Sequence, residues 1–335
     1  MASTSTTSPT PNSSLNGKVV LITGATKGIG RAIALRVASA GAKVVVNYAS
    51  DAAAADELVS LIGSDNSISV RADAGSVPEL ERLVAAAVER FGRIDVVIPN
   101  AGIMPMRTVE NTTEEDFDRA FNLNVKGPYF LVQKALPHMA PGGRIVLVSS
   151  GLTRSTSVAP PYLLYNATKG AIEQMTRLLA KGLGAKGIVV NAIAPGPTAT
   201  ELFFQGKSEQ VLGAIKASSP FGRIGDPEEI AGVAAFLASD DKPGLWTVQE
   251  LALSKSAILL CGGKTGAFHN LTVVIDALVR RGQAAEEIDF ITSFLAAEFH
   301  EFNMRNFLDG GFGTRGEGAD DSERYEEFVC DGPEG

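Results

Sequence analysis

The stretch "KVVLITGATKGIGRAIA", residues 18–34, decides the fold class. A β-branched run ends at a glycine-rich turn, and a helix-forming segment follows. Backbone N–H groups at such a helix start point outward and the helix dipole favours negative charge, so this arrangement forms an anion site. Gly24 permits the tight turn, Gly28 lets the backbone approach a pyrophosphate, and Gly30 allows the helix to pack closely on the strand. The spacing is G-x-x-x-G-x-G, and after a first strand it favours dinucleotide binding over a purely structural turn.

Short apolar runs alternate with helix-length amphipathic stretches along the chain. Strands are predicted at 18–23, 42–48, 67–73, 94–100, 143–150 and 187–196, and helices at 28–40, 51–63, 77–91, 114–139 and 164–184. Continuous Val/Ile runs, apolar on both faces, are typical of a parallel sheet covered on both sides. The alternation predicts an α/β protein with a doubly wound parallel sheet and helices on both faces, a Rossmann fold with an atypical C-terminal extension.

The composition divides the chain into three parts. Residues 1–15 are predicted to be a flexible polar tail, 16–242 the Rossmann-type domain and 243–335 an atypical C-terminal segment. Within the last part we predict a final strand at 256–263, helices within 270–308 and an acidic, disordered end at 309–335.

Charge and hydropathy exclude several functional classes. The formal net charge is −8, but residues 316–335 carry eight acidic side chains and one arginine, which leaves only −1 for the rest. Because the rest of the chain is nearly neutral, it does not predict the basic surface that nucleic-acid binding needs. The sequence contains no run of 18 apolar residues, so it predicts no membrane span. Residues 1–14 do not resemble a signal peptide, and a cytoplasmic protein is therefore expected. The two cysteines and three scattered histidines predict neither a disulfide scaffold nor a metal site.

The second predicted strand bears on the choice of nucleotide. An NAD-selective site usually places a carboxylate at the end of this strand, but here it ends "NYAS" (47–50), and the first acid is Asp51. Lys27 in the glycine loop could meet a 2′-phosphate, although it could also be a solvated loop lysine. We therefore favour NADP(H), with NAD(H) as the alternative. Asp73, after the third strand, could accept a hydrogen bond from the adenine amino group or cap the next turn.

The stretch "YLLYNATKG" (162–170) places Tyr165 and Lys169 four residues apart. On a helix these positions lie on the same face. A nearby ammonium favours the phenolate and is expected to lower the phenol pKa from about 10. Such a pair could give a proton to a carbonyl oxygen or take one from an alcohol. Two fixed residues alone would far more often belong to an ordinary helix surface.

Four motifs in order strengthen this interpretation: "TGATKGIG" (23–30), "NAG" (100–102), "VSS" (148–150) with "YNATK" (165–169), and "APG" (194–196). With these motifs, residues 16–240 resemble the short-chain dehydrogenase/reductase family, and are most similar to its polyhydroxynaphthalene reductase-like ketoreductases. The resemblance implies an NADP(H)-dependent oxidoreductase that transfers a hydride between the nicotinamide and a small, largely apolar carbonyl or alcohol substrate.

The resemblance also implies roles for individual residues. Tyr165 would be the acid/base, and Lys169 would lower its pKa and bind the nicotinamide ribose. Ser150, which occupies the family's serine position rather than Ser149, would hydrogen-bond the substrate oxygen. Asn124 would hold a water in the proton relay, unless it is an ordinary helix-bend residue. The expected cofactor-binding residues are Gly24, Thr26, Lys27, Gly28, Ile29, Gly30, Asn47, Tyr48, Ala49, Ser50, Asp73, Ala74, Asn100, Ala101, Gly102, Tyr165, Lys169, Pro195, Gly196, Thr198 and Thr200.

The region after "APG" and the end of the chain raise further expectations. In the family, residues 197–229 would form a lid over the substrate, in which Leu202, Phe203 and Phe204 would line the pocket or simply pack in the core. Family members often form tetramers through the helices near 114–139 and 164–184, so a homo-oligomer is expected. The usual closing W-x-x-G-Q…DGG pattern is incomplete here, which leaves a catalytically impaired nucleotide-binding or interaction protein as the alternative.

Overall fold

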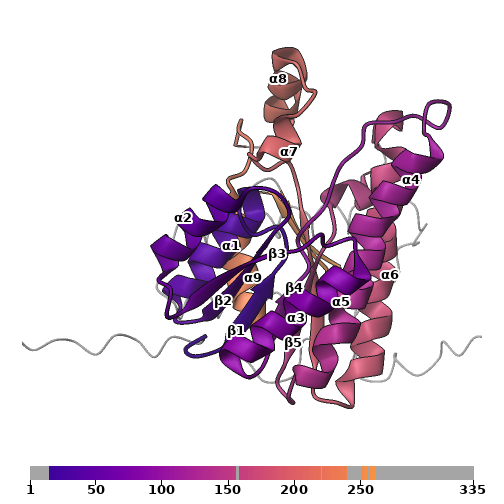
Figure 1. Cartoon of the computed structure of the whole chain (residues 1–335). Helices are drawn as coiled ribbons and strands as arrows, with labels where there is room; N and C mark the ends of the chain where they lie inside the picture. The colour runs from indigo at the N-terminus through magenta and orange to yellow at the C-terminus, as the bar shows by residue number, and fades with distance from the viewer. Residues whose placement is uncertain (1–14, 156–157, 220, 240–249, 255–256, 262–335) are drawn as a thin grey trace, which may run out of the picture. The chain divides into compact units, whose positions relative to one another are not determined.

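A computed structural model describes residues 15–155, 158–219, 221–239, 250–254 and 257–261 (Figure 1). They all belong to one compact unit, Met1–Leu271. The predicted helices within 270–308, the acidic end at 309–335 and nearly all of the N-terminal tail lie outside the described residues. In the described ranges, no helix is both long and apolar enough to cross a membrane.

The described strands form one sheet in the order β3-β2-β1-β4-β5-β6-β7-β8. Their bounds are β1 Val19–Ile22, β2 Lys43–Tyr48, β3 Ser67–Arg71, β4 Val96–Ile98, β5 Arg144–Val148, β6 Val189–Pro195, β7 Glu250–Ser254 and β8 Ala257–Cys261. Strands β1 to β7 pair in parallel, and β8 pairs antiparallel with β7. The predicted doubly wound parallel sheet is therefore confirmed.

Helices cover both faces of this sheet (Figure 1). The α-helices are α1 Gly28–Ser39, α2 Ala52–Ile62, α3 Val77–Phe91, α4 Glu114–Phe121, α5 Gly127–Ala135, α6 Leu163–Gly184, α7 Glu201–Phe204, α8 Glu209–Ala217 and α9 Pro227–Ala238. A π-helix η1, Asn122–Lys126, joins α4 to α5, and short 3₁₀ helices lie at η2 Leu136–His138, η3 Gly151–Arg154 and η4 Pro160–Tyr162.

Successive side chains along a strand pack alternately into two hydrophobic cores, one on each face of the sheet. In β1, Val20 and Ile22 join the core beneath α1, α2 and α9, whereas Val19 and Leu21 join the core beneath α3, α5 and α6. Successive side chains of a strand point to opposite faces, so a strand covered on both sides must be apolar at every position. This is the physical reason for the continuous Val/Ile runs in the sequence.

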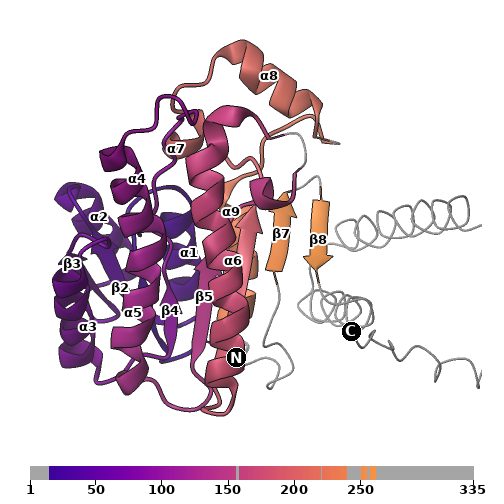
Figure 2. The same cartoon turned by 90° about the vertical axis from the view of Figure 1, so that its right-hand side faces the viewer.

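Two elements differ from the expected secondary structure. The predicted helix 114–139 is interrupted by the π-helix η1, and α5 ends before η2. At the end of the sheet, the strand at 250–254 was not predicted. It takes the seventh parallel position, and Ala257–Cys261 follows as an antiparallel partner, with Ser254 paired to Ala257 (Figure 2). Antiparallel strands need only a tight connection, whereas a parallel partner needs a long crossover, so two runs this close in sequence pair antiparallel.

The strand order reverses between β1 and β4, which lie side by side although β2 and β3 follow β1 in the chain. In doubly wound sheets such a switch point opens a crevice outside the carboxyl ends of the strands. The glycine loop follows β1 and the "NAG" segment follows β4, so both lie at this edge. The helices α7 and α8, which follow β6, stand above the same edge (Figures 1 and 2).

Candidate active site

The glycine loop has a backbone that few other residues could adopt. Gly24 and Gly28 have φ values of +61° and +48°, in the left-handed region that favours glycine. A Cβ on Gly30 would lie 2.2 Å from the carbonyl oxygen of Gly24 and 2.5 Å from Nδ2 of Asn100. The start of α1 therefore rests directly against the loop.

Two side-chain amides, one of them buried, hold this loop in place. The Asn100 side chain donates from Nδ2 to the carbonyl oxygens of Thr23, at 2.9 Å, and Gly24, at 3.1 Å. The Asn47 Oδ1 atom accepts from the Gly24 N–H at 3.3 Å, and its Nδ2 atom donates to the Ala72 carbonyl at 2.9 Å. Both residues were predicted to contact the cofactor, but the structure directs their side chains into the framework. They position the loop.

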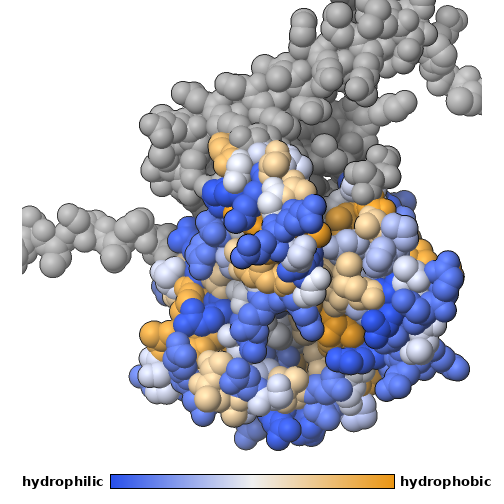
Figure 3. Space-filling model, turned by 90° about the horizontal axis from the view of Figure 1, so that it is seen from above, coloured by the Kyte–Doolittle hydropathy of each residue, from blue (hydrophilic) through white to orange (hydrophobic). Residues whose placement is uncertain are grey.

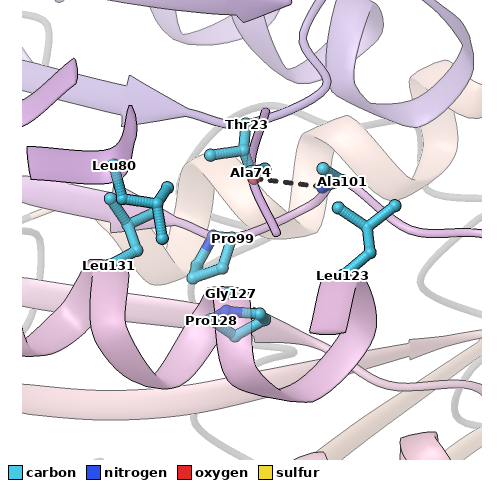
Figure 4. A pocket seen from close by; sticks show the side chains of 9 residues that line it. All are labelled: Thr23, Ala74, Leu80, Pro99, Ala101, Leu123, Gly127, Pro128 and Leu131. Carbon is cyan, nitrogen blue, oxygen red and sulfur yellow. Dashed lines mark hydrogen bonds between the residues drawn. The ribbon is translucent and has the colours of Figure 1, made fainter. Parts of the chain in front are cut away.

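A small apolar pocket lies beneath the loop (Figure 4). It is lined by Thr23, Ala74, Leu80, Pro99, Ala101, Leu123, Gly127, Pro128 and Leu131, and it has no room for a water molecule. The Thr23 Oγ1 atom accepts from the Ala101 N–H at 3.1 Å, the bond drawn in Figure 4. Ala74 and Ala101, both predicted near the cofactor, therefore take part in closing the floor of the crevice.

The remaining predicted nucleotide residues lie around the ends of β2 and β3. Tyr48 packs partly against the core under α1, whereas Ala49 and Ser50 are exposed. Asp73 uses one carboxylate oxygen to accept from the Gly75 N–H at 2.9 Å, the turn-capping alternative. Sequence reasoning missed Arg71, whose Nε donates to the Ala49 carbonyl at 3.1 Å and brings a second cation to this end of the sheet.

Two adjacent serines follow β5, and they face different partners. The Ser150 hydroxyl hydrogen-bonds the phenol of Tyr165 on α6. The Ser149 hydroxyl instead donates to Glu173 Oε1 at 3.2 Å and to the Lys169 carbonyl at 3.3 Å. Because neighbouring side chains of an extended segment point in opposite directions, only Ser150 can meet a group beside Tyr165. This geometry supports the choice of Ser150 over Ser149.

Lys169 lies on the same side of α6 as Tyr165, but its ammonium is directed to the backbone. Its Nζ atom donates to the Val148 carbonyl at 2.7 Å and lies 5.7 Å from the centre of the Tyr165 ring. Burial lowers the pKa of Lys169 to about 8.

The expected lowering of the Tyr165 pKa is wrong for this structure. Burial raises the pKa of the Tyr165 phenol because desolvation disfavours the phenolate. The hydrogen bond from Ser150 opposes this rise, and the neighbouring Tyr162 adds to it. Lys169 does not offset the effect of burial, since its ammonium is held at the Val148 carbonyl. The site is therefore arranged to keep the phenol protonated.

The buried Asn124 side chain links the segment after "NAG" to α6, the helix that carries Tyr165. It accepts from the Ile103 N–H and donates to the Ile103 carbonyl, both at 2.9 Å, and donates to Thr168 Oγ1 at 3.1 Å. Thr168 in turn donates to the Tyr165 carbonyl at 2.6 Å. Both Nδ2 hydrogens are used, so the predicted relay water would have to bind the remaining acceptor sites or the backbone.

Sequence reasoning missed Thr168 and Glu173, which support this site from behind. Glu173 is buried, and it also accepts from Thr153 and pairs with Arg154 at 3.4 Å. Thr168 lies inside the "YNATK" motif but was given no role, and Glu173 lies outside the motifs; both follow Tyr165 on α6 at helical spacing. The π-helix at Asn122–Lys126 is a further signal, since such bulges are frequent at functional sites.

The predicted lid, residues 197–229, begins beside the glycine loop. Pro195 ends β6, and the Thr198 hydroxyl donates to the Gly196 carbonyl at 3.0 Å. Thr200 caps α7 by accepting from the Phe203 N–H at 3.1 Å. Its methyl group lies only 2.8 Å from the point where a Cβ on Gly28 would stand. The first lid helix is therefore in contact with the nucleotide loop.

The lid helices bury none of their residues. Leu202 and Phe204 are exposed, so core packing does not explain them. The centre of the Phe203 ring lies 4.6 Å from the Lys207 ammonium, which also lies 5.9 Å from the centre of the Tyr162 ring just before α6. Seen from above, hydrophobic and hydrophilic residues are interspersed on this face (Figure 3). The described residues contain no group of three His, Cys, Asp or Glu side chains able to hold a metal.

The chain belongs to the short-chain dehydrogenase/reductase family of oxidoreductases, because residues 24–252 match the family model described as enoyl-(acyl carrier protein) reductase and curated members are about 40% identical. Versicolorin reductase stcU from Emericella nidulans is 42% identical over 246 residues, which cover 70% of this chain and 93% of that protein. A probable tetrahydroxynaphthalene reductase from Zymoseptoria tritici is 40% identical over 247 residues, covering 70% and 91%.

Solved structures of this family share the fold. A short-chain dehydrogenase from Burkholderia cenocepacia in complex with NADP has a TM-score of 0.68 and 31% identity, and covers 72% of this chain and 98% of its own. A blue fluorescent protein from a metagenomic library in complex with NADPH has a TM-score of 0.68 and 34% identity, with the same coverage. The predicted family is therefore confirmed.

Proposed function

We propose that this protein is an NADP(H)-dependent carbonyl reductase or alcohol dehydrogenase that uses Tyr165 as its acid/base. The observation that carries the proposal is the hydrogen bond between Ser150 and Tyr165 beside the buried Lys169, at the carboxyl edge of the sheet. The glycine loop supports a dinucleotide site, since Gly24 and Gly28 adopt left-handed backbone conformations at the start of α1 and the exposed Lys27 stands between them. A bound nicotinamide would supply the hydride.

Side chains of the protein would hydrogen-bond and protonate the substrate oxygen. Negative charge develops on this oxygen as hydride reaches the carbon. The Ser150 hydroxyl donates a hydrogen bond to the oxygen, and Tyr165 delivers its proton to complete the alcohol. Lys169 supplies a buried positive charge behind this centre. Asn124 and Thr168 fix the helix that carries Tyr165.

The exposed apolar side chains of the lid suit a small, largely apolar substrate. The reductases among its relatives, named for versicolorin and tetrahydroxynaphthalene, make aromatic carbonyl compounds the first choice for a screen. The test follows NADPH oxidation with quinones, diketones and aryl ketones. Tight NADPH binding without turnover of any of them would favour the alternative, a nucleotide-binding protein without catalysis.

We expect the pH dependence of carbonyl reduction to follow two ionisations, that of Lys169 and that of the Tyr165 phenol. Burial raises the pKa of Tyr165 above the ordinary phenol value of about 10, so the acid form persists through neutral and moderately alkaline pH. The proton donor should therefore be lost only as the pH rises past this raised pKa. Loss of the Lys169 charge, whose pKa burial lowers to about 8, should change the reduction rate in an earlier step near pH 8. Alcohol oxidation needs the phenolate and should increase as the pH passes the raised pKa of Tyr165. Initial rates in both directions test this, and a complete loss of reduction between about pH 7 and 9 would contradict it.

We expect Lys27→Ala to erode a preference for NADPH over NADH. Lys27 is exposed beside the glycine loop, where its ammonium could pair with a 2′-phosphate. Loss of one charge-assisted contact of about 1.4 kcal/mol corresponds to a tenfold rise in the NADPH dissociation constant. The NADH constant should stay unchanged. Titration of cofactor fluorescence measures both values, and equal weakening of the two cofactors would argue against a phosphate contact.

We also propose a homo-oligomer formed through α4, α5 and α6. Large apolar side chains are exposed on these helices, with Phe117 at 47%, Tyr129 at 49% and Leu178 at 69%. Sedimentation should therefore show a species heavier than one chain, and Leu178→Glu should shift it toward the monomer. Leu61→Glu on α2, where the leucine is 60% exposed on the opposite side of the sheet, is the matched control. A monomeric wild type would contradict the proposal.

A further inference from the structure

The one lysine of the glycine loop is held by carboxylates from two different elements. Its Nζ atom lies 3.1 Å from Glu201 Oε2 and 3.8 Å from Asp51 Oδ2. The Lys27 and Glu201 side chains are 53% and 79% exposed, so the pair is a surface contact that either partner can leave at little cost. The hydrogen bond and charge of Glu201 raise the pKa of Lys27, so the lysine stays positive.

Glu201 belongs to the lid and not to the nucleotide-binding half of the sheet. It is the first residue of α7 and follows Thr200, whose methyl group contacts Gly28. The two contacts together join the lid to the glycine loop at the point where Lys27 would meet a cofactor phosphate. The ion pair therefore spans the entrance to the predicted 2′-phosphate position.

Lys27 could not keep both of its carboxylate partners once a cofactor 2′-phosphate bound beside it. Lys27 carries one positive charge and already faces the two carboxylates of Glu201 and Asp51. A 2′-phosphate would add up to two more negative charges within a few ångströms, and like charges so close repel strongly. Asp51 is fixed as the N-cap of α2, where it accepts from the Ala54 N–H at 3.1 Å. Glu201 is the partner that can move away.

We propose that Glu201 is a cofactor-specificity residue that competes with the 2′-phosphate of NADP(H) for Lys27. The phosphorylated cofactor displaces Glu201 and frees α7 from the glycine loop. NAD(H), which lacks the phosphate, leaves the pair intact. Lid movement is thereby coupled to the phosphorylation state of the cofactor. This inference rests on the proposed NADP(H) dependence.

Glu201→Gln tests the competition in the full-length protein by titration with NADPH and NADH. Removal of the competing charge should tighten NADPH binding about two- to fivefold, the range for an exposed ion pair, and leave NADH binding unchanged. Glu209→Gln is the matched control, because Glu209 is an exposed lid carboxylate in the first turn of α8 and is not a partner of Lys27. In a Lys27→Ala background, Glu201→Gln should have no effect.

Hydrogen exchange of the α7 amides gives a readout independent of turnover. NADPH should speed exchange in α7 of the wild type, and NADH should not. Adenosine 2′-phosphate alone should reproduce the effect, and adenosine 5′-phosphate should not. In Glu201→Gln, α7 should exchange faster already without cofactor.

The outcomes separate this inference from the proposed function. If neither cofactor binds, both the NADP(H) proposal and the competition are overturned. If NADPH binds and is preferred but Glu201→Gln changes neither its affinity nor α7 exchange, only the competition is overturned. Equal tightening of NADPH and NADH would also overturn it, because the effect would then not depend on the phosphate.

Discussion

Tyr165→Phe should lower kcat for carbonyl reduction by about 10²- to 10⁴-fold, the usual contribution of a positioned proton donor. The substitution removes only the hydroxyl that Ser150 contacts, and it keeps the ring that packs over Lys169. The substrate oxygen would then have to take its proton from water. Single-turnover measurement of NADPH oxidation with the best substrate of the screen reports this step directly.

The same variant must leave the rest of the site intact for this result to be meaningful. The NADPH dissociation constant and the midpoint of thermal unfolding should both stay close to the wild-type values. Tyr129→Phe, which removes the hydroxyl of an exposed tyrosine on α5, should leave the rate unchanged. A Tyr165→Phe variant that turns over at the wild-type rate would remove Tyr165 from its assigned role.

Gly30→Ala should both destabilise the protein and weaken nucleotide binding. The added Cβ would stand 2.2 Å from the Gly24 carbonyl oxygen and 2.5 Å from the Asn100 amide, and backbone atoms of a packed loop cannot simply give way. Overpacking of this kind costs about 1–3 kcal/mol. Denaturant unfolding should show this loss. If the loop moves to relieve the strain, the same energy corresponds to roughly a 5- to 150-fold weaker affinity for NADPH.

A second helical glycine gives the opposite expectation. A Cβ on Gly232, within α9, would meet no atom within 4 Å. Gly232→Ala should therefore raise the free energy of unfolding by about 0.5–1 kcal/mol, because alanine loses less backbone entropy in a helix. Its NADPH affinity should be that of the wild type. If Gly30→Ala behaved like Gly232→Ala, the close contact of α1 with the loop would be wrong.

The sequence predicted those parts of the molecule that depend on local pattern. Strands β1 and β4, in the middle of the sheet, are apolar and buried at every position because both faces of the sheet are covered, so the pattern and the burial coincide there. Ser150 could be separated from Ser149 because adjacent residues in an extended segment face opposite ways. Tyr165 and Lys169 share a side of α6 because they are one helical turn apart.

The parts that could not be predicted depend on contacts between distant residues. The hydrogen bond from Asn124 to Thr168 joins residues 44 positions apart, and that from Asn100 to Thr23 joins residues 77 apart. No spacing rule connects such pairs. The pKa of Tyr165 was predicted in the wrong direction because a sequence shows the neighbouring charge of Lys169 but not the burial that outweighs it.

The Asn47 amide has a practical consequence for protein engineering. Its side chain and backbone both bond the glycine loop, and its Nδ2 atom also reaches the carbonyl of Ala72 after β3. Grafting a new segment after β2 to redesign nucleotide preference can therefore alter residues 49 and 50, which are exposed, as long as the asparagine at position 47 is retained. A graft that replaces Asn47 would remove the side-chain hydrogen bonds that hold the glycine loop, and so would disturb the nucleotide site that the redesign is meant to change.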